Sequence, residues 1–99
     1  MKLNNINIRI ALNSSENLDE EMVLYNEEAS KIIVLNRSAA YVWKKIIEFV
    51  EEKTDFRSEN IVDKLLSYYE LSKESFNEVL IDVNETIELL FEAGLIVKV

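Results

Sequence analysis

The first third of the chain alternates apolar and polar positions. Apolar side chains recur at every second position from Ile6 to Leu12, which predicts a β-strand with one apolar face. Two further runs, Met22–Tyr25 and Lys31–Leu35, are rich in β-branched and aromatic residues and flank the polar segment 26–30. We expect these runs to form a β-hairpin. The polar segment 13–20 carries Asn, Ser and Asp, so we expect a loop there.

Beyond the hairpin, apolar positions are spaced by three and four residues, which predicts three amphipathic helices. Asn36 is placed to cap the first helix, which should end near Glu52. Ser58 is the expected N-cap of a shorter second helix, and Ser72 opens a long third one. Gly94 stands where a left-handed C-terminal cap belongs.

This order of elements defines the expected architecture. Strands segregated from helices indicate an α+β fold, with a three-stranded antiparallel sheet followed by three α-helices that cover it. Because 99 residues suffice for one core, we expect a single domain over residues 1–99. The apolar tail 95–97 should fold back against the body.

Composition excludes most catalytic chemistry. The chain has no His, no Cys and one Gly, so zinc sites of His or Cys, His-based triads, disulfides and Gly-rich phosphate loops are impossible. Carboxylates are present, but not at the spacing of a calcium-binding loop. We therefore expect no enzyme, no metal and no cofactor, which leaves binding, scaffolding and regulation.

Hydropathy gives no sign of a membrane protein. The longest aliphatic run is Ile32–Leu35, whereas a membrane-spanning helix needs roughly 20 apolar residues. The N-terminal stretch has no apolar core of the kind found in signal peptides. We therefore expect a cytoplasmic protein without a membrane partner.

Charge is unevenly distributed along the chain. The net charge is −8, and residues 58–99 carry three basic and nine acidic side chains. The segment 31–45 carries no acid and four basic residues, Lys31, Arg37, Lys44 and Lys45. We call these four the basic island. Such residues commonly form only a solvated helix face, but they could also attract an acidic partner.

The same distribution argues against nucleic acid as a partner. From Lys73 to Ala93, the predicted third helix holds one Lys against six acidic residues. DNA-binding proteins neutralise phosphates with Lys and Arg, so this helix is unsuited to be a recognition helix.

The segment 22–43 and the end of the chain resemble the PqqD family of small peptide-binding domains, also called RiPP recognition elements. The likeness spans about residues 21–97, although the hairpin turn has Ala29-Ser30 where family members often carry Gly. It is carried by an ordered set of motifs: Leu35-Asn36, Ser38-Ala39-Ala40, Val42-Trp43, Ile61–Leu65, Tyr68-Tyr69 and Leu89–Ile96.

The resemblance implies a winged helix-turn-helix-like fold that binds peptides. In the family, the leader segment of a ribosomal precursor peptide adds as a strand to a free sheet edge and packs between that strand and the third helix. Here the edge is Lys31–Leu35, which has no Pro, so its amides can donate. The leader-binding residues that the resemblance implies are Lys31, Ile32, Ile33, Val34, Leu35, Phe76, Val79 and Val83. Arg37, Lys44 and Lys45 are possible electrostatic contacts.

The function that this resemblance implies is a free-standing peptide chaperone. Such a protein binds the leader and presents the precursor to a separate modifying enzyme, a radical SAM protein in pyrroloquinoline quinone assembly or a leader peptidase in lasso-peptide maturation. The sequence does not choose between these pathways. The alternative is an acidic winged-helix adaptor or transcriptional regulator without leader affinity, and the apolar stripe of the third helix would then serve only the core.

Overall fold

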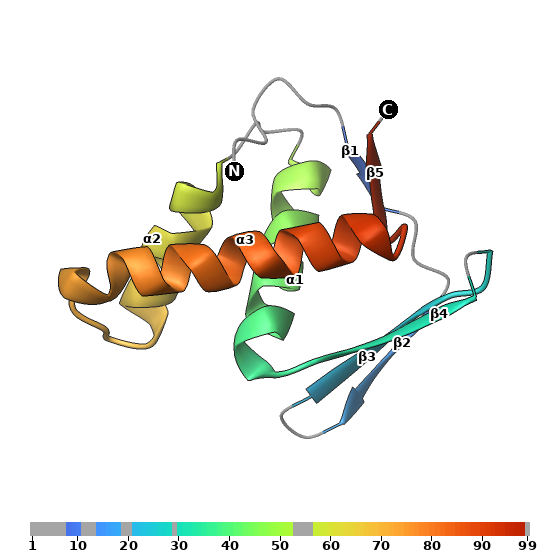
Figure 1. Ribbon diagram of the computed structural model, residues 1–99, viewed down its shortest axis with the longest axis horizontal. Helices are drawn as coiled ribbons and strands as arrows, with labels where there is room; N and C mark the ends of the chain where they lie inside the picture. The colour runs from blue at the N-terminus through green and yellow to red at the C-terminus, as the bar shows by residue number, and fades with distance from the viewer. Residues whose placement is uncertain (1–7, 11–13, 19–20, 29, 53–56, 99) are drawn as a thin grey trace.

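Three antiparallel strands lead into three helices, which confirms the expected α+β class (Figure 1). The computed structural model describes residues 8–10, 14–18, 21–28, 30–52 and 57–98. The elements, in chain order, are β1 (Ile8–Ile10), β2 (Ser14–Leu18), β3 (Glu21–Asn26), β4 (Lys31–Leu35), α1 (Arg37–Glu51), α2 (Ser58–Tyr68), the 3₁₀ turn η1 (Lys73–Ser75), α3 (Phe76–Glu92) and β5 (Ile96–Lys98).

The three-stranded sheet has the order β2-β3-β4, with the predicted hairpin as its β3 and β4. Leu24 lies opposite Ile33 in the register, and both side chains are buried. The neighbouring pair, Val23 and Val34, points to the other face of the sheet, as the twofold side-chain period requires. One face of the hairpin therefore completes the core, and the other is left partly to solvent.

The prediction of a loop over residues 13–20 is wrong for Ser14–Leu18, which forms β2 and pairs with β3. Side chains from Ser15 to Asn17 are exposed, so this edge strand carries little apolar signal. Its pairing with the apolar β3 outweighs its low intrinsic strand propensity.

The expected first strand does not join the three-stranded sheet. Its described part, β1, pairs antiparallel with β5, where Ile10 lies opposite Ile96. The rest of the predicted span 6–12 lies outside the described residues. This pairing confirms that the apolar tail folds back against the body, and it brings the two ends of the described chain together (Figure 1).

The helix ends follow local hydrogen bonding. As predicted, Asn36 caps α1, because its Oδ1 accepts from the backbone N–H of Ala39 at 2.9 Å. The predicted N-cap at Ser58 is wrong: Ser58 is the first residue of α2, and the cap is Arg57, whose N–H donates to Asn60 Oδ1 at 2.7 Å.

The third helix begins later than predicted, since Ser72 opens the 3₁₀ turn η1 and α3 starts at Phe76. Gly94 has the expected left-handed backbone, with φ 72°. The N–H of Leu95 bonds the Leu90 carbonyl at 3.0 Å, which completes a Schellman cap. Helix α3 crosses in front of α1 and extends toward the sheet (Figure 1). Its buried residues Val83, Ile87 and Leu90 join a core that includes Leu24, Leu35, Trp43, Ile46 and Ile61.

Candidate functional site

Strand β4 forms one edge of the sheet. Among the described strands, β3 is the one hydrogen-bonded to it, so its other side is open. Ile33 and Leu35 are buried in the core, whereas Ile32 and Val34 are 68% and 55% exposed on the opposite face. An unpaired edge with exposed β-branched side chains is the usual template for adding another strand.

A cleft of about 530 Å³ lies beside this edge. One side comes from the end of β4 and the start of α1, and the opposite wall is α3. Leu65 and Tyr69 of the α2 region complete the cleft. Its lining residues include Val34, Leu35, Ala39, Val42, Val79, Asp82, Val83, Glu85, Thr86 and Leu89.

The structure brings together half of the leader-binding residues expected from the sequence. Val34, Leu35, Val79 and Val83 line the cleft, from opposite walls. The other four are not among its lining residues. Lys31 and Ile32 are exposed on β4, Ile33 belongs to the core, and Phe76 is half-buried against the core at the start of α3.

Several lining residues were missed by the sequence reasoning. Asn36, Ser38 and Thr86 add polar groups to the cleft, and Asp82 and Glu85 add charge. A signal for the residues on α3 was present, because positions 79, 82, 83 and 86 lie three and four residues apart on one helix face. The residues expected from α3 were apolar only, namely Phe76, Val79 and Val83, so the polar positions on the same face were not included.

The charged groups that line the cleft are both acidic. Asp82 and Glu85 are exposed and lie three residues apart on α3, and neither forms an ion pair with another described residue. The Thr86 hydroxyl donates to the Asp82 backbone carbonyl at 3.0 Å, so the Asp82 carboxylate is not occupied by that bond. The cleft thus has an apolar base and an anionic wall, which Asp82 and Glu85 of α3 form.

A second concavity, of about 160 Å³, holds part of the basic island. Its charged lining residues are Arg37, Lys44 and Glu21, and Tyr41 and Tyr68 line it as well. The rings of Tyr41 and Tyr68 stack at a tilt, with 4.7 Å between their centroids. Among the described residues, Tyr69 is the one that lines both concavities, so the basic concavity is a separate surface from the cleft.

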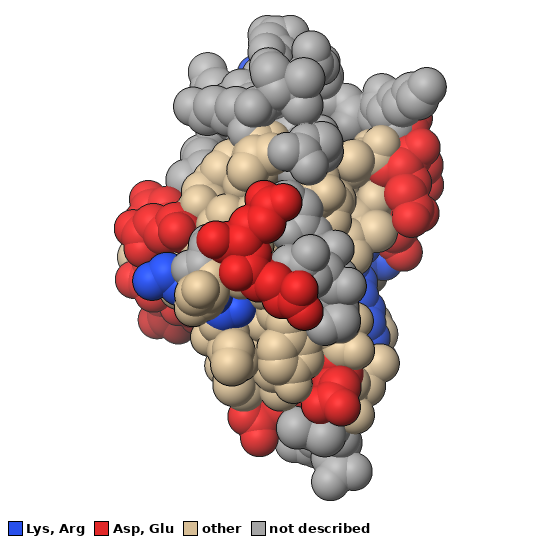
Figure 2. Space-filling view, turned by 90° about the vertical axis from the view of Figure 1, so that its right-hand side faces the viewer, with Lys and Arg blue, Asp and Glu red and all other residues tan. Residues whose placement is uncertain are grey.

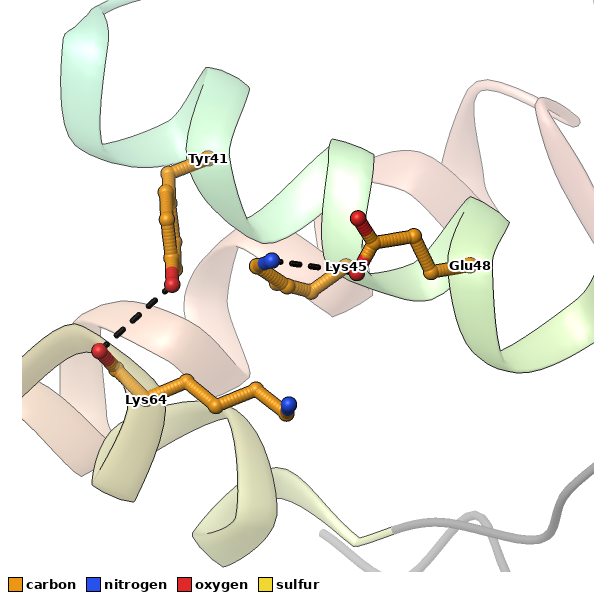
Figure 3. Close-up of polar contacts among 4 residues, drawn as sticks. All are labelled: Tyr41, Lys45, Glu48 and Lys64. Carbon is orange, nitrogen blue, oxygen red and sulfur yellow. Dashed lines mark hydrogen bonds and ion pairs between the residues drawn. The ribbon is translucent and has the colours of Figure 1, made fainter. Parts of the chain in front are cut away.

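The four residues of the basic island do not all lie in this concavity. Lys45 Nζ lies 3.0 Å from Glu48 Oε2 and 5.0 Å from the centre of the Tyr41 ring, so its charge is engaged within α1 (Figure 3). The hydrogen bond to Glu48 raises the pKa of Lys45. Tyr41 reaches across to α2, where its hydroxyl donates to the Lys64 carbonyl at 3.5 Å (Figure 3). Lys31 lies on β4 and lines neither concavity.

The surface is otherwise acidic. Figure 2 shows one face of the molecule, on which Asp and Glu cover more of the surface than Lys and Arg. All six acidic residues of η1 and α3 are exposed: Glu74, Glu78, Asp82, Glu85, Glu88 and Glu92. This exposure adds to the argument against phosphate binding by α3.

The part of the chain that the structure describes offers neither a metal site nor a membrane span. It contains no group of three or more acidic residues arranged to hold a metal ion. Its helices are also too short or too polar to span a membrane.

Comparisons with known proteins identify the family and a solved structure with the same fold. The family model described as coenzyme PQQ synthesis protein D (PqqD) matches residues 21–96. A solved structure, "TbiB1 in Complex with the TbiA(beta) Leader Peptide", has the same fold with a TM-score of 0.60 and 22% sequence identity. The similarity covers 97% of this chain and 94% of TbiB1. No curated protein sequence matches the chain.

Proposed function

Because the chain belongs to the PqqD family, we propose that it binds the leader segment of a ribosomally synthesised precursor peptide and delivers it to a separate modifying enzyme. The observation that carries this proposal is the free edge of β4 lying directly beside the apolar cleft. The fold shared with TbiB1, whose structure was solved in complex with a leader peptide, supports it.

Strand addition explains how this edge can bind a peptide. An extended peptide placed along β4 exchanges main-chain hydrogen bonds with its open side, which supplies affinity for any sequence without Pro. Selectivity then has to come from side chains. The β4 edge provides the main-chain hydrogen bonds, and the cleft provides the contacts with side chains.

The two faces of β4 set the pattern of the bound peptide. Side chains of an added strand alternate between the faces of the sheet. Those on the Leu35 side enter the cleft toward Val79 and Val83. Those on the other side lie beside Ile32 and Val34, of which Val34 also borders the cleft. We therefore expect a leader segment with apolar residues on both faces along the five residues of β4.

Delivery requires a second surface that remains free when the cleft is occupied. The basic concavity fits this role, since Arg37 and Lys44 line it and it shares one described lining residue with the cleft. An acidic surface of the modifying enzyme is its expected partner. The chemistry is left to that enzyme, a radical SAM protein or a leader peptidase, because this chain has no His or Cys to act with.

Isothermal titration of the chain with the leader segment of a precursor peptide encoded beside its gene tests the proposal. Saturable binding that is lost in Val34→Pro, with the fold retained, supports strand addition at β4. Because neighbouring residues of a strand direct their amides to opposite sides, Ile33→Pro is the matched variant and should disrupt pairing with β3. Absence of heat with the wild-type chain would favour an adaptor without leader affinity.

A further inference from the structure

We propose that the peptide bound in the cleft carries a Lys or Arg side chain that pairs with Asp82 and Glu85. This inference rests on the proposed function and names the substrate class more narrowly. It concerns the anionic wall of the cleft, which strand addition alone does not explain.

The two carboxylates are placed to meet a side chain of the bound peptide. Asp82 and Glu85 lie on the face of α3 that lines the cleft, one helical turn apart, between Val79 and Leu89. Leu35 and Val34 stand on the opposite wall. A peptide lying along β4 therefore directs its cleft-facing side chains toward this part of α3.

The charge of the cleft is uncompensated. Of its described lining residues, none is basic, and no ion pair joins Asp82 or Glu85 to another described residue. A peptide that covers the cleft removes water from both carboxylates, which is unfavourable unless a cation or a hydrogen-bond donor replaces that water. The wall thus disfavours neutral or acidic peptides as well as attracting basic ones.

The apolar part of the wall suits the stem of such a side chain. Lys and Arg pack their methylene groups on apolar surface while the charged end stays at the rim. Leu89 and Val79, which flank the carboxylates on α3, provide that surface. An Arg can also reach both carboxylates, because its guanidinium presents several donors in one plane.

A displayed library of random 12-residue peptides, selected on the full chain, tests the inference without knowledge of the natural leader. We expect the selected peptides to share alternating apolar residues and an enriched Lys or Arg at one fixed position relative to them. The same selection on the double variant Asp82→Asn with Glu85→Gln should lose the basic position and keep the apolar ones.

Affinity measurements on one selected peptide give the size of the effect. The double variant should bind it about three- to tenfold more weakly at low salt, and replacing the basic residue of the peptide by norleucine should cost a similar factor. The two losses should not add when combined. Glu88→Gln is the matched control on α3, because Glu88 is exposed and lies outside the cleft lining; it should leave the affinity unchanged.

The outcomes separate this inference from the proposed function. Peptides with the apolar pattern but no basic enrichment, or with acidic enrichment, would overturn the inference and leave peptide binding standing. A selection that yields no peptide with affinity for the chain would overturn both.

Discussion

The side-chain amide of Asn26 donates a buried 3.0 Å hydrogen bond to the backbone carbonyl of Ala93, 67 residues further along the chain. Asn26 ends β3, and Ala93 is the C-cap of α3. The bond therefore ties the hairpin that carries the free edge to the helix that forms the opposite wall of the cleft. We interpret it as a contact that fixes the distance between the two walls.

Replacing Asn26 by Ala should lower both stability and peptide affinity. The variant leaves the buried Ala93 carbonyl without this donor, which costs about 1 to 3 kcal/mol of the free energy of unfolding. Urea denaturation measures the stability, and titration with a cleft-binding peptide measures the affinity. Asn77→Ala, on an exposed position of α3, is the control and should change neither. Equal behaviour of the two variants would contradict the role given to the bond.

Glu70→Gly should stabilise the protein. Glu70 follows α2 with a left-handed backbone, φ 54°, where the Leu71 N–H bonds the Leu66 carbonyl at 2.8 Å. A side chain in this conformation costs about 1 to 2 kcal/mol, which Gly avoids at some entropic cost in the unfolded chain. We expect a net gain of up to about 1 kcal/mol in thermal or urea unfolding. Glu70→Ala removes the charge without relieving the backbone, so a gain of the same size in that variant would show that charge is the cause.

Alkaline pH should act through Tyr25, whose hydroxyl donates to Glu16 Oε2 at 3.1 Å between β3 and β2. This hydrogen bond raises the pKa of Tyr25 above its ordinary value of 10.0, with desolvation and the Glu16 charge acting in the same direction. Because the neutral phenol is favoured in the folded state, the hydrogen bond stabilises the folded protein below pH 10. This stabilisation is lost as the pH rises through the raised pKa of Tyr25.

The difference in tyrosinate absorbance between wild type and Tyr25→Phe should therefore titrate with a midpoint above 10.0. In Glu16→Ala the same midpoint should move back toward 10.0. A midpoint that does not respond to Glu16→Ala would mean that the bond does not govern this titration.

Charge reversal at Lys44 should weaken binding of the modifying enzyme without changing leader binding. Lys44→Glu places an acid in the basic concavity, so we expect binding of the modifying enzyme to weaken about two- to fivefold at low ionic strength and less at high salt. Affinity for a cleft-binding peptide should stay unchanged, since Lys44 does not line the cleft.

Two further variants control this measurement. Lys73→Glu makes the same change of charge at an exposed position outside both concavities and should have no effect on enzyme binding. Lys45→Glu should affect enzyme binding less than Lys44→Glu, because the Lys45 ammonium is already paired with Glu48. Unchanged enzyme binding after reversal of both Lys44 and Lys45 would contradict the assignment.

The sequence predicts those elements whose local pattern agrees with their place in the fold. The hairpin is indicated by its two apolar runs, and both α1 with its Asn36 cap and the end of α3 at Gly94 combine an apolar period with the matching cap residue. Strand β2 could not be found this way, because Ser14–Leu18 becomes a strand only through pairing with β3. The pairing of β1 with β5 could not be predicted either, because β5 lies at the other end of the chain.

The candidate site was predictable at the level of elements and less so at the level of residues. Family resemblance indicated the β4 edge and α3, but the division of β4 between core and solvent depends on which face α3 covers. Ile33 was therefore expected in the site although it is buried in the core. A signal for the pairing of Lys45 with Glu48 was present, because the two residues lie three positions apart on the predicted first helix, but Lys45 was assigned to the basic island without regard to it.

Amide hydrogen exchange of the full chain, free and saturated with a peptide selected on the cleft, tests peptide capture at β4 most directly. Alternate amides of β4 face the open side of the sheet, and we expect Ile32 and Val34 to be the donors. Strand addition at β4 predicts that their exchange slows at least about tenfold on binding, while amides already bonded to β3 change little. Protection confined to the basic concavity, with the exchange of β4 unchanged, would contradict it.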